Sequence, residues 1–232
     1  MPRLPRYVLP GVPQHIIQRG NNRQAIFAAD CDYLAYLEWL RQAAEQYGLH
    51  IHAYVLMTNH VHLLATPLVA DSIGKTLQSL GRRYVQYFNY RYGRTGTLWE
   101  GRYRATVIDA QRYFLACSRY IELSPFRAAM VEVPGAYRWS SYRCNALGEE
   151  NCLVTEHDVY RSLGCSAELR QAAYRGLFQQ AVTDEFLDTL RDATNKGWAL
   201  GNERFCAEVE ALAVRRAAPL PRGRANKSTL TP

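Results

Sequence analysis

Two histidines separated by a single apolar residue, His60 and His62, stand at the head of an apolar run in the segment TNHVHLL. Side chains alternate between the two faces of a strand, so in an extended chain both imidazoles point the same way while Val61 and Leu63 point into a core. Two imidazoles on one face can supply a pair of nitrogen ligands to a divalent metal. The spacing therefore predicts part of a metal site, whose remaining ligands must come from elsewhere.

A second pair, His50 and His52, has the same spacing a few residues earlier. Spacing alone does not choose between the two pairs, and either could be ordinary strand histidines. Thr58-Asn59 separates two strand-like runs and predicts a tight hairpin, which places His60 and His62 near the beginning of a strand. That position favours them as ligands, because a strand end is easier to reach.

A candidate nucleophile lies on the segment 109–123, which has a helical pattern. Tyr113, Cys117, Tyr120 and Ser124 recur on one face of that helix. A phenol can attack a phosphodiester when a metal draws charge off the phosphate, and the product is a covalent phosphotyrosyl bond. The chain has 16 tyrosines, and a helical tyrosine is usually a core residue. From the residues alone, Tyr113 and Tyr120 both remain open.

The segment 82–104 interleaves arginines with aromatic residues. Guanidinium groups contact backbone phosphates, and aromatic faces stack unpaired bases at about 1–3 kcal/mol per base. We interpret Tyr84 and Phe88 as core residues of a helix, because they continue its apolar stripe. The side chains expected to contact DNA are Arg82, Arg83, Arg91, Arg94, Arg102, Arg104, Trp99 and Tyr103.

The composition indicates that the protein binds an acidic partner. The net charge is +7 and the pI is about 9.2, and lysine occurs only at Lys75, Lys196 and Lys227. Arginine suits phosphate oxygens and bases, so nucleic acid is favoured over a membrane surface. Six scattered cysteines without a CxxC pair, and an N-terminus without a signal-peptide pattern, predict a reduced, cytoplasmic protein.

The pattern of apolar residues and turn formers predicts an α+β fold. Strands are expected at 12–19, 49–57, 60–66 and 97–108, and helices at 30–47, 73–90 and 109–123. This order fits a ferredoxin-like antiparallel sheet with helices packed on one face.

Three units are expected along the chain. The first is a domain at 1–145, whose segment 139–142 is interpreted as a surface stretch that packs back on it. The second is a small helical appendage at 146–216, with helices near 157–163, 167–180, 183–194 and 202–216. The third is a basic, disordered tail at 217–232.

Three motifs in order carry a family resemblance. The segments AYVLMTNHVHLL at 53–64, LWEGRY at 98–103 and RYIELSPFRA at 119–128 closely resemble the HUH single-tyrosine transposases. Within that group the chain looks most like the REP-associated tyrosine transposases. The resemblance covers roughly 6–142, and three motifs at family-like spacing are far more specific than one alone.

The resemblance implies a metal-dependent nuclease and strand transferase that acts on single-stranded DNA beside hairpins. His60 and His62 would hold Mg²⁺ or Mn²⁺, and Tyr120 would form a 5′-phosphotyrosine, with Tyr113 as the alternative nucleophile. Relatives usually carry Asn where this chain has Ser124, so Ser124 is a doubtful third ligand. The oligomeric state, monomer or homodimer, stays open.

Two other readings remain. One is a domesticated protein that binds hairpin DNA with little or no catalysis. In that case, Ser124 in place of Asn would be a sign that catalysis was lost. The other is a replication or conjugation nuclease of the wider HUH group, which we favour less because those proteins often have longer chains and additional tyrosines.

Overall fold

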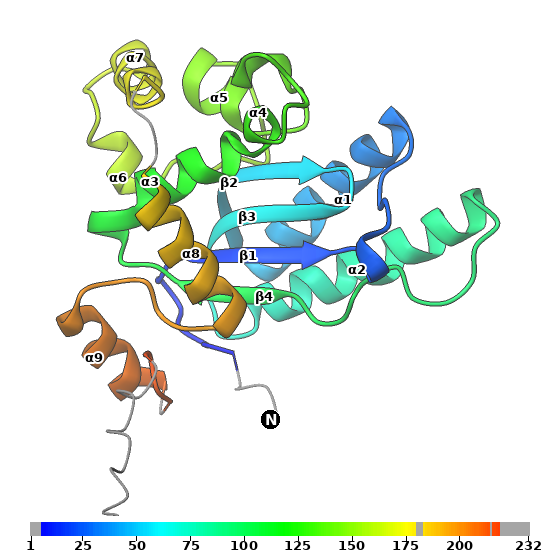
Figure 1. Ribbon diagram of the computed structural model, residues 1–232, viewed down its shortest axis with the longest axis horizontal. Coiled ribbons are helices and arrows are strands. Elements are labelled where there is room, and N and C mark those ends of the chain that lie inside the picture. The colour runs from blue at the N-terminus through cyan, green and yellow to red at the C-terminus, as the bar shows by residue number, and fades with distance from the viewer. Residues whose placement is uncertain (1–5, 180–182, 214, 219–232) are drawn as a thin grey trace, which may run out of the picture.

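The computed structural model describes residues 6–179, 183–213 and 215–218. At its centre is a four-stranded sheet made of β1 (Gln14–Arg19), β2 (Leu49–Met57), β3 (His60–Pro67) and β4 (Arg104–Val107). The strand order is β2-β3-β1-β4, and every neighbouring pair is antiparallel. With a helix after β1 and another after β3, this connectivity confirms the predicted ferredoxin-like α+β fold (Figure 1).

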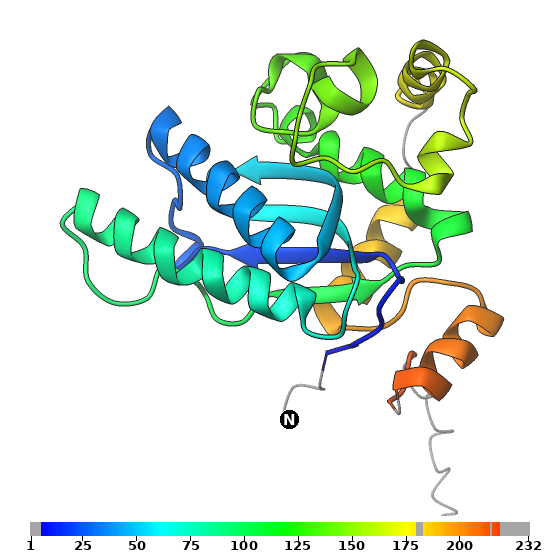
Figure 2. The same cartoon turned by 180° about the vertical axis from the view of Figure 1, so that it is seen from behind.

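Two long helices cover one face of the sheet, α1 (Asp30–Tyr47) and α2 (Ser72–Arg91), as seen from behind in Figure 2. The helix predicted at 30–47 has the observed bounds, and the one predicted at 73–90 is longer by one residue at each end. Each helix buries an apolar stripe that packs on the sheet and on its neighbour. Helix α1 ends at Gly48, whose φ of 65° is a left-handed conformation that glycine adopts without steric cost.

One strand prediction needs correction. The segment 97–108 was expected to be one strand, but it pairs with β1 only over Arg104–Val107, and before that it contacts the end of β1 only at an isolated bridge between Trp99 and Gly20. Gly101, with φ 139°, bends the chain between these two points. The strand predicted at 49–57 has the bounds of β2, in which a bulge between Ile51 and Ala53 shifts the register with β3.

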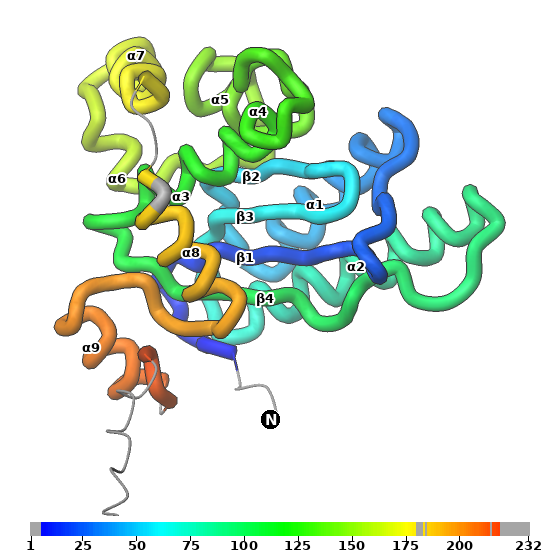
Figure 3. Tube along the Cα trace, viewed as in Figure 1, coloured from blue at the N-terminus to red at the C-terminus, as the bar shows by residue number. Residues whose placement is uncertain are grey.

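Helices also cover the second face of the sheet, so the prediction of helices on one face only was incomplete. Helix α3 (Ala110–Glu122) lies across β2 and β3, and α8 (Asp184–Lys196) lies across β1 and β4. Figures 1 and 3 show α8 in front of these strands. A helix predicted to belong to a separate appendage therefore packs directly on the sheet.

The remaining elements surround this core: η1 (Asn21–Arg23), α4 (Ser124–Arg127), η2 (Pro134–Ala136), α5 (Tyr142–Leu147), α6 (Asp158–Arg161), α7 (Ala167–Leu177) and α9 (Glu203–Ala213). The predicted surface stretch at 139–142 is largely buried, because Trp139 and Ser140 line the free edge of β2, where the Leu56 amide donates to the Trp139 carbonyl at 2.9 Å.

Helix α9 packs against the N-terminal segment. Tyr7, Leu9, Val107 and Val209 form a small second apolar cluster with Ala217, which is fully buried. Ala217 was predicted to begin the tail, and residues 219–232 of that tail lie outside the described residues. No helix in the described part of the chain has the length and apolar character needed to cross a membrane.

Candidate functional site

His60 and His62 lie at the start of β3 with their side chains on the face that α3 and α8 cover. Their ring centroids are 4.9 Å apart and their planes are inclined by 76°. His60 is half-buried, whereas His62 is only 4% exposed. The alternation of strand side chains thus brings both imidazoles together, as the sequence predicted.

The competing pair does not form such an arrangement. His50 is exposed, and the bulge after Ile51 interrupts the alternation before His52. The His52 ring is buried, with one nitrogen 2.6 Å from the Thr155 carbonyl and the other 2.8 Å from the Thr66 hydroxyl. Because both of its nitrogens are occupied in this way, His52 has a structural role.

Tyr120 meets the histidines from α3. Its ring packs edge-on against His62, with centroids 5.6 Å apart and planes inclined by 85°. The tyrosine is 9% exposed. Burial raises the pKa of its phenol, and a hydrogen bond with Arg191 of α8 and the charge of that guanidinium oppose the shift.

The alternative tyrosine lies elsewhere. Tyr113 stacks on Phe186 of α8, with centroids 5.9 Å apart. It precedes Tyr120 by seven residues, which is about 10 Å along a helix axis. The Ser124 hydroxyl donates to the Tyr120 carbonyl at 2.9 Å, so its proton is committed to the backbone while its oxygen lone pairs keep their capacity to accept.

A third histidine, which the sequence reasoning did not single out, completes this cluster. His15 of β1 is 1% exposed, and its Nε2 lies 2.9 Å from Nδ1 of His62. The two rings are parallel to within 3°, with centroids 5.1 Å apart. Since the facing nitrogens are so much closer than the ring centres, the rings lie end to end rather than face to face. The other nitrogen of His15 lies 3.0 Å from the Thr194 hydroxyl of α8.

The histidines sit in an environment that keeps them neutral. Burial lowers the pKa of His15 to about 3. Burial, together with the charge of Arg19, lowers the pKa of His60 to about 4. The pKa of His62 is also well below its usual range, because of burial and then the neighbouring histidines and Arg19. Neutral imidazoles carry a free lone pair, which is what a metal ligand requires.

The donor set fits a metal held by two protein nitrogens. Among the described residues, no group of three or more His, Cys, Asp or Glu side chains is arranged to hold a metal ion. His60 and His62 could therefore supply two ligands, and oxygen atoms from outside this set, such as water or a substrate phosphate, would supply the others.

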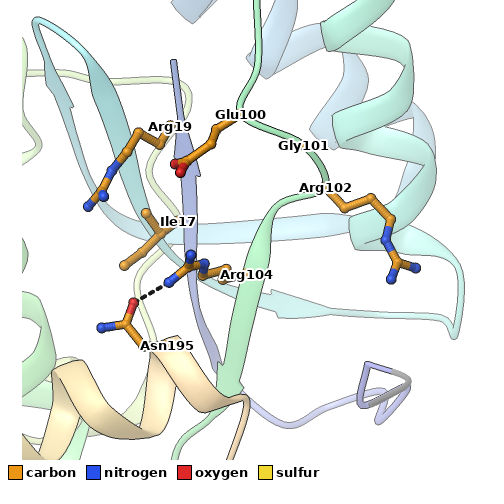
Figure 4. A pocket seen from close by; sticks show the side chains of 7 residues that line it. All are labelled: Ile17, Arg19, Glu100, Gly101, Arg102, Arg104 and Asn195. Atoms are coloured by element: carbon orange, nitrogen blue, oxygen red, sulfur yellow. Dashed lines mark hydrogen bonds between the residues drawn. The ribbon is translucent and has the colours of Figure 1, made fainter. Parts of the chain in front are cut away.

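A basic pocket, shown in Figure 4, is lined partly by β1 residues that pair with the two histidines. Arg19 lies opposite His60 in the β1–β3 register, and Ile17 lies opposite His62. The pocket is lined by these two residues together with Glu100, Gly101, Arg102, Arg104 and Asn195. Arg104 donates a hydrogen bond to the Asn195 side chain of α8, and Arg102 points away from that pair. The arrangement can accept a phosphate beside the two imidazoles.

The predicted DNA-binding residues separate into two groups. Arg102 and Arg104 line the basic pocket, and Tyr103 lines an adjoining hollow that shares these two arginines. The Arg6 guanidinium sits 3.6 Å from the centre of the Tyr103 ring. The others lie on α2 or in the loop that follows it. Three of these arginines have hydrogen-bond partners: Arg83 bonds to Gln42, Arg91 to Tyr92 and Arg94 to Gln24. Arg82 is exposed, and Trp99 packs beside Tyr84.

A buried polar network lies behind Tyr120, at the end of α3. Glu122 is 0% exposed and accepts hydrogen bonds from Ser141 at 2.5 Å, Asn145 at 2.8 Å and Tyr174 at 2.8 Å. Burial raises the pKa of its carboxyl group to about 7, against the opposing effect of these three donors. The network ties the helix that carries Tyr120 to α5 and α7.

The residues that sequence reasoning missed come mainly from α8. Arg191, Thr194 and Asn195 approach the site from a segment about 70 residues beyond Tyr120. Nothing in their spacing signals this role. The sequence could have indicated His15 and Arg19, because both share one face of a predicted strand with Ile17.

Comparison with known proteins places these residues in a family. Residues 10–124 match the sequence family described as transposase IS200 like. Among solved structures, the chain is similar to a REP-associated tyrosine transposase bound to a REP hairpin, at 17% identity and a TM-score of 0.52, over 68% of this chain and 93% of that one. No curated protein matches the chain.

A second solved structure, of a candidate transposase from Deinococcus radiodurans R1, shares 28% identity over 53% of this chain and 96% of that one, with a TM-score of 0.36 that is too low to indicate a common fold. The family match runs from β1 to the end of α3 and so contains His60, His62 and Tyr120. Through residues 10–124, this chain belongs to the IS200-like transposase family.

Proposed function

We propose that this protein is a metal-dependent transposase and nuclease of the HUH tyrosine type, which cleaves and rejoins single-stranded DNA next to hairpins. The observation that carries the proposal is the edge-on contact of Tyr120 with His62, at a ring separation of 5.6 Å. A nucleophile from α3 and a pair of metal-ligand histidines from β3 thus meet beside a basic pocket. The similar REP-associated enzyme was bound to a hairpin, and we extend that substrate class to this chain.

In the proposed reaction the Tyr120 oxygen attacks the scissile phosphorus, and the bond from phosphorus to the 3′ oxygen of the neighbouring nucleotide breaks. The phenol proton leaves to solvent, and the 3′ oxygen takes up a proton to become a free hydroxyl. The 5′ end stays attached as a phosphotyrosine, and attack by another 3′ hydroxyl reverses the step and joins strands. Mg²⁺ or Mn²⁺ bound by His60 and His62 would withdraw charge from the phosphate.

The chain's own residues have distinct parts in this scheme. Arg19 and Arg104 hold the phosphate backbone in the pocket beside the imidazoles. Arg191 stabilises the phenolate of Tyr120 as its proton leaves, because its positive charge lowers the phenol pKa. Glu122 and its three donors keep the end of α3 in place.

A second candidate function is hairpin-DNA binding with little or no catalysis. It is favoured by the burial of the reacting groups, since Tyr120 is 9% exposed and His62 is 4% exposed. Helix α3, which carries Tyr120, packs on β2 and β3, and α8 packs on β1 and β4, so a DNA strand must either enter at the half-buried His60 or displace part of this helical layer. A protein that only binds hairpins needs no such access.

Incubation of a labelled hairpin oligonucleotide carrying a single-stranded flank, with Mg²⁺ or Mn²⁺, separates the two functions. The transposase proposal expects a cleaved product and a covalent adduct that survives denaturing electrophoresis. Tyr120→Phe should abolish the adduct and keep DNA binding in a gel-shift assay. Tyr113→Phe is the matched control on the same helix and should still cleave. Tight binding without cleavage in either metal would refute the transposase proposal and favour the function of hairpin-DNA binding.

A further inference from the structure

The direction of each hydrogen bond around the histidines can be worked out from two backbone carbonyls. The Thr194 hydroxyl donates its only proton to the Leu190 carbonyl at 2.8 Å, one turn earlier in α8. Its oxygen must therefore accept from His15, whose Nδ1 is 3.0 Å away. A hydroxyl has one proton to give, so His15 carries its proton on Nδ1.

The same argument continues to His62. Both rings are buried, which favours the neutral form. A neutral His15 that is protonated on Nδ1 has a lone pair on Nε2, and that atom lies 2.9 Å from Nδ1 of His62. His62 Nδ1 must therefore be the donor, and its lone pair is on Nε2.

His60 has the same tautomer, but a separate pair of hydrogen bonds sets it. The Asn59 amide nitrogen donates to the Arg23 carbonyl at 3.1 Å, which fixes the orientation of the side chain. The Asn59 oxygen then faces Nδ1 of His60 at 2.7 Å and can only accept. His60 is consequently protonated on Nδ1 as well, with its lone pair on Nε2.

We propose that Thr194 and His15 are positioning residues that set His62 in the tautomer with a free Nε2, as Asn59 does for His60. Both histidines then present the same atom as ligand. This inference rests on the proposed function, in which the pair binds a divalent metal. It assigns to α8, which lies outside the matched family segment 10–124, a direct part in preparing the site. Partners that fix the tautomer of a metal-binding histidine typically change metal affinity about 10–100-fold when they are removed.

The tautomers can be read directly by two-bond ¹H–¹⁵N correlation NMR of the full-length, metal-free protein, in which protonated and unprotonated ring nitrogens have well-separated shifts. The expected result is protonation on Nδ1 for His15, His60 and His62. A His62 ring protonated on Nε2 would overturn the inference, since it would mean that Thr194 donates to His15 and that His15 donates to His62.

Three variants on α8 test the role of the hydroxyl. Thr194→Val keeps the shape and removes the hydroxyl, and it should mix the His15 and His62 tautomers and weaken Mn²⁺ binding about tenfold or more, as measured by electron paramagnetic resonance of the free ion. Thr194→Ser restores the hydroxyl and should restore both properties.

Thr189→Val is the matched control, because Thr189 makes the same hydroxyl bond to the carbonyl four residues earlier but is exposed. If Thr194→Val matched Thr189→Val in both tautomer and Mn²⁺ affinity, the positioning role would be wrong. Wild-type protein that cleaves hairpin DNA while His62 is protonated on Nε2 would overturn this inference alone. Expected tautomers and Mn²⁺ binding without DNA cleavage would overturn the proposed function alone.

Discussion

Replacement of Glu122 by glutamine tests the buried network that holds the end of α3. One carboxylate oxygen accepts from Ser141 and Asn145, and the other accepts from Tyr174 at 2.8 Å. A glutamine oxygen can keep the first two bonds. Its amide nitrogen would face the Tyr174 hydroxyl, which can rotate to accept. The substitution therefore preserves the packing and removes only the titration.

The pKa of Glu122 sets the expected size of the effect. Burial raises it from 4.5 to about 7. Below pH 4.5 the group is protonated in both the folded and the unfolded protein. As pH rises from 4.5 to 7, the unfolded protein loses the proton first, so the folded state binds more protons and the free energy of unfolding falls. At about 1.4 kcal/mol per pH unit, this interval corresponds to a loss of about 3 kcal/mol that is complete above pH 7.

Urea or thermal unfolding of both proteins between pH 4 and pH 8.5 measures this difference. The stability of Glu122→Gln relative to wild type should rise by about 3 kcal/mol across the interval, or roughly 6–12 °C in Tm for a chain of this size. Glu132→Gln, at an exposed carboxylate, is the control and should follow wild type. Parallel pH profiles for Glu122→Gln and wild type would refute the reasoning.

Three further predictions concern charged groups around the site and the core. Arg104→Ala should weaken binding of single-stranded DNA and reduce the salt dependence of log K by about 0.7 in fluorescence titrations, whereas Arg83→Ala, on α2 across the sheet, should leave that slope unchanged. Arg191→Ala should raise the pKa of Tyr120 further and lower the cleavage rate at fixed pH, with the rising limb of the pH–rate profile shifted to higher pH. Asp32→Ala should destabilise the protein by about 3 kcal/mol or more in urea unfolding, because two backbone N–H groups and two tyrosine hydroxyls lose their buried acceptor.

Local patterns in the sequence were enough to predict most of the matched family segment. Helical periodicity with a glycine stop placed α1 at its observed bounds, and strand alternation put His60 and His62 on one face. These features depend on neighbours within a few residues, so the sequence contains the necessary information. The beginning of β4 could not be predicted in this way, because the strand-like pattern at 97–108 starts before the bend at Gly101, whereas the pairing with β1 starts only at Arg104.

The choice of tyrosine required more than periodicity. Tyr113 and Tyr120 are both on the helix face that the spacing predicts, and the family resemblance selected Tyr120. The structure brings Tyr120 to 5.6 Å from His62 and stacks Tyr113 on Phe186 of α8. The packing of α3 on β2 and β3 decides which of these two equivalent positions meets the histidines.

The surroundings of the histidine pair were decided by tertiary structure alone. His15 precedes His62 by 47 residues, and Thr194 follows His15 by 179, yet hydrogen bonds join them in one chain. The docking of α8 on β1 and β4 makes this contact, and no local pattern encodes the position at which one helix packs on a distant sheet. The sequence by itself determined which residues could bind a metal and attack a phosphate. The burial of those residues, their tautomers and the helix that covers them follow only from the folded chain, since each depends on groups that are far apart in sequence.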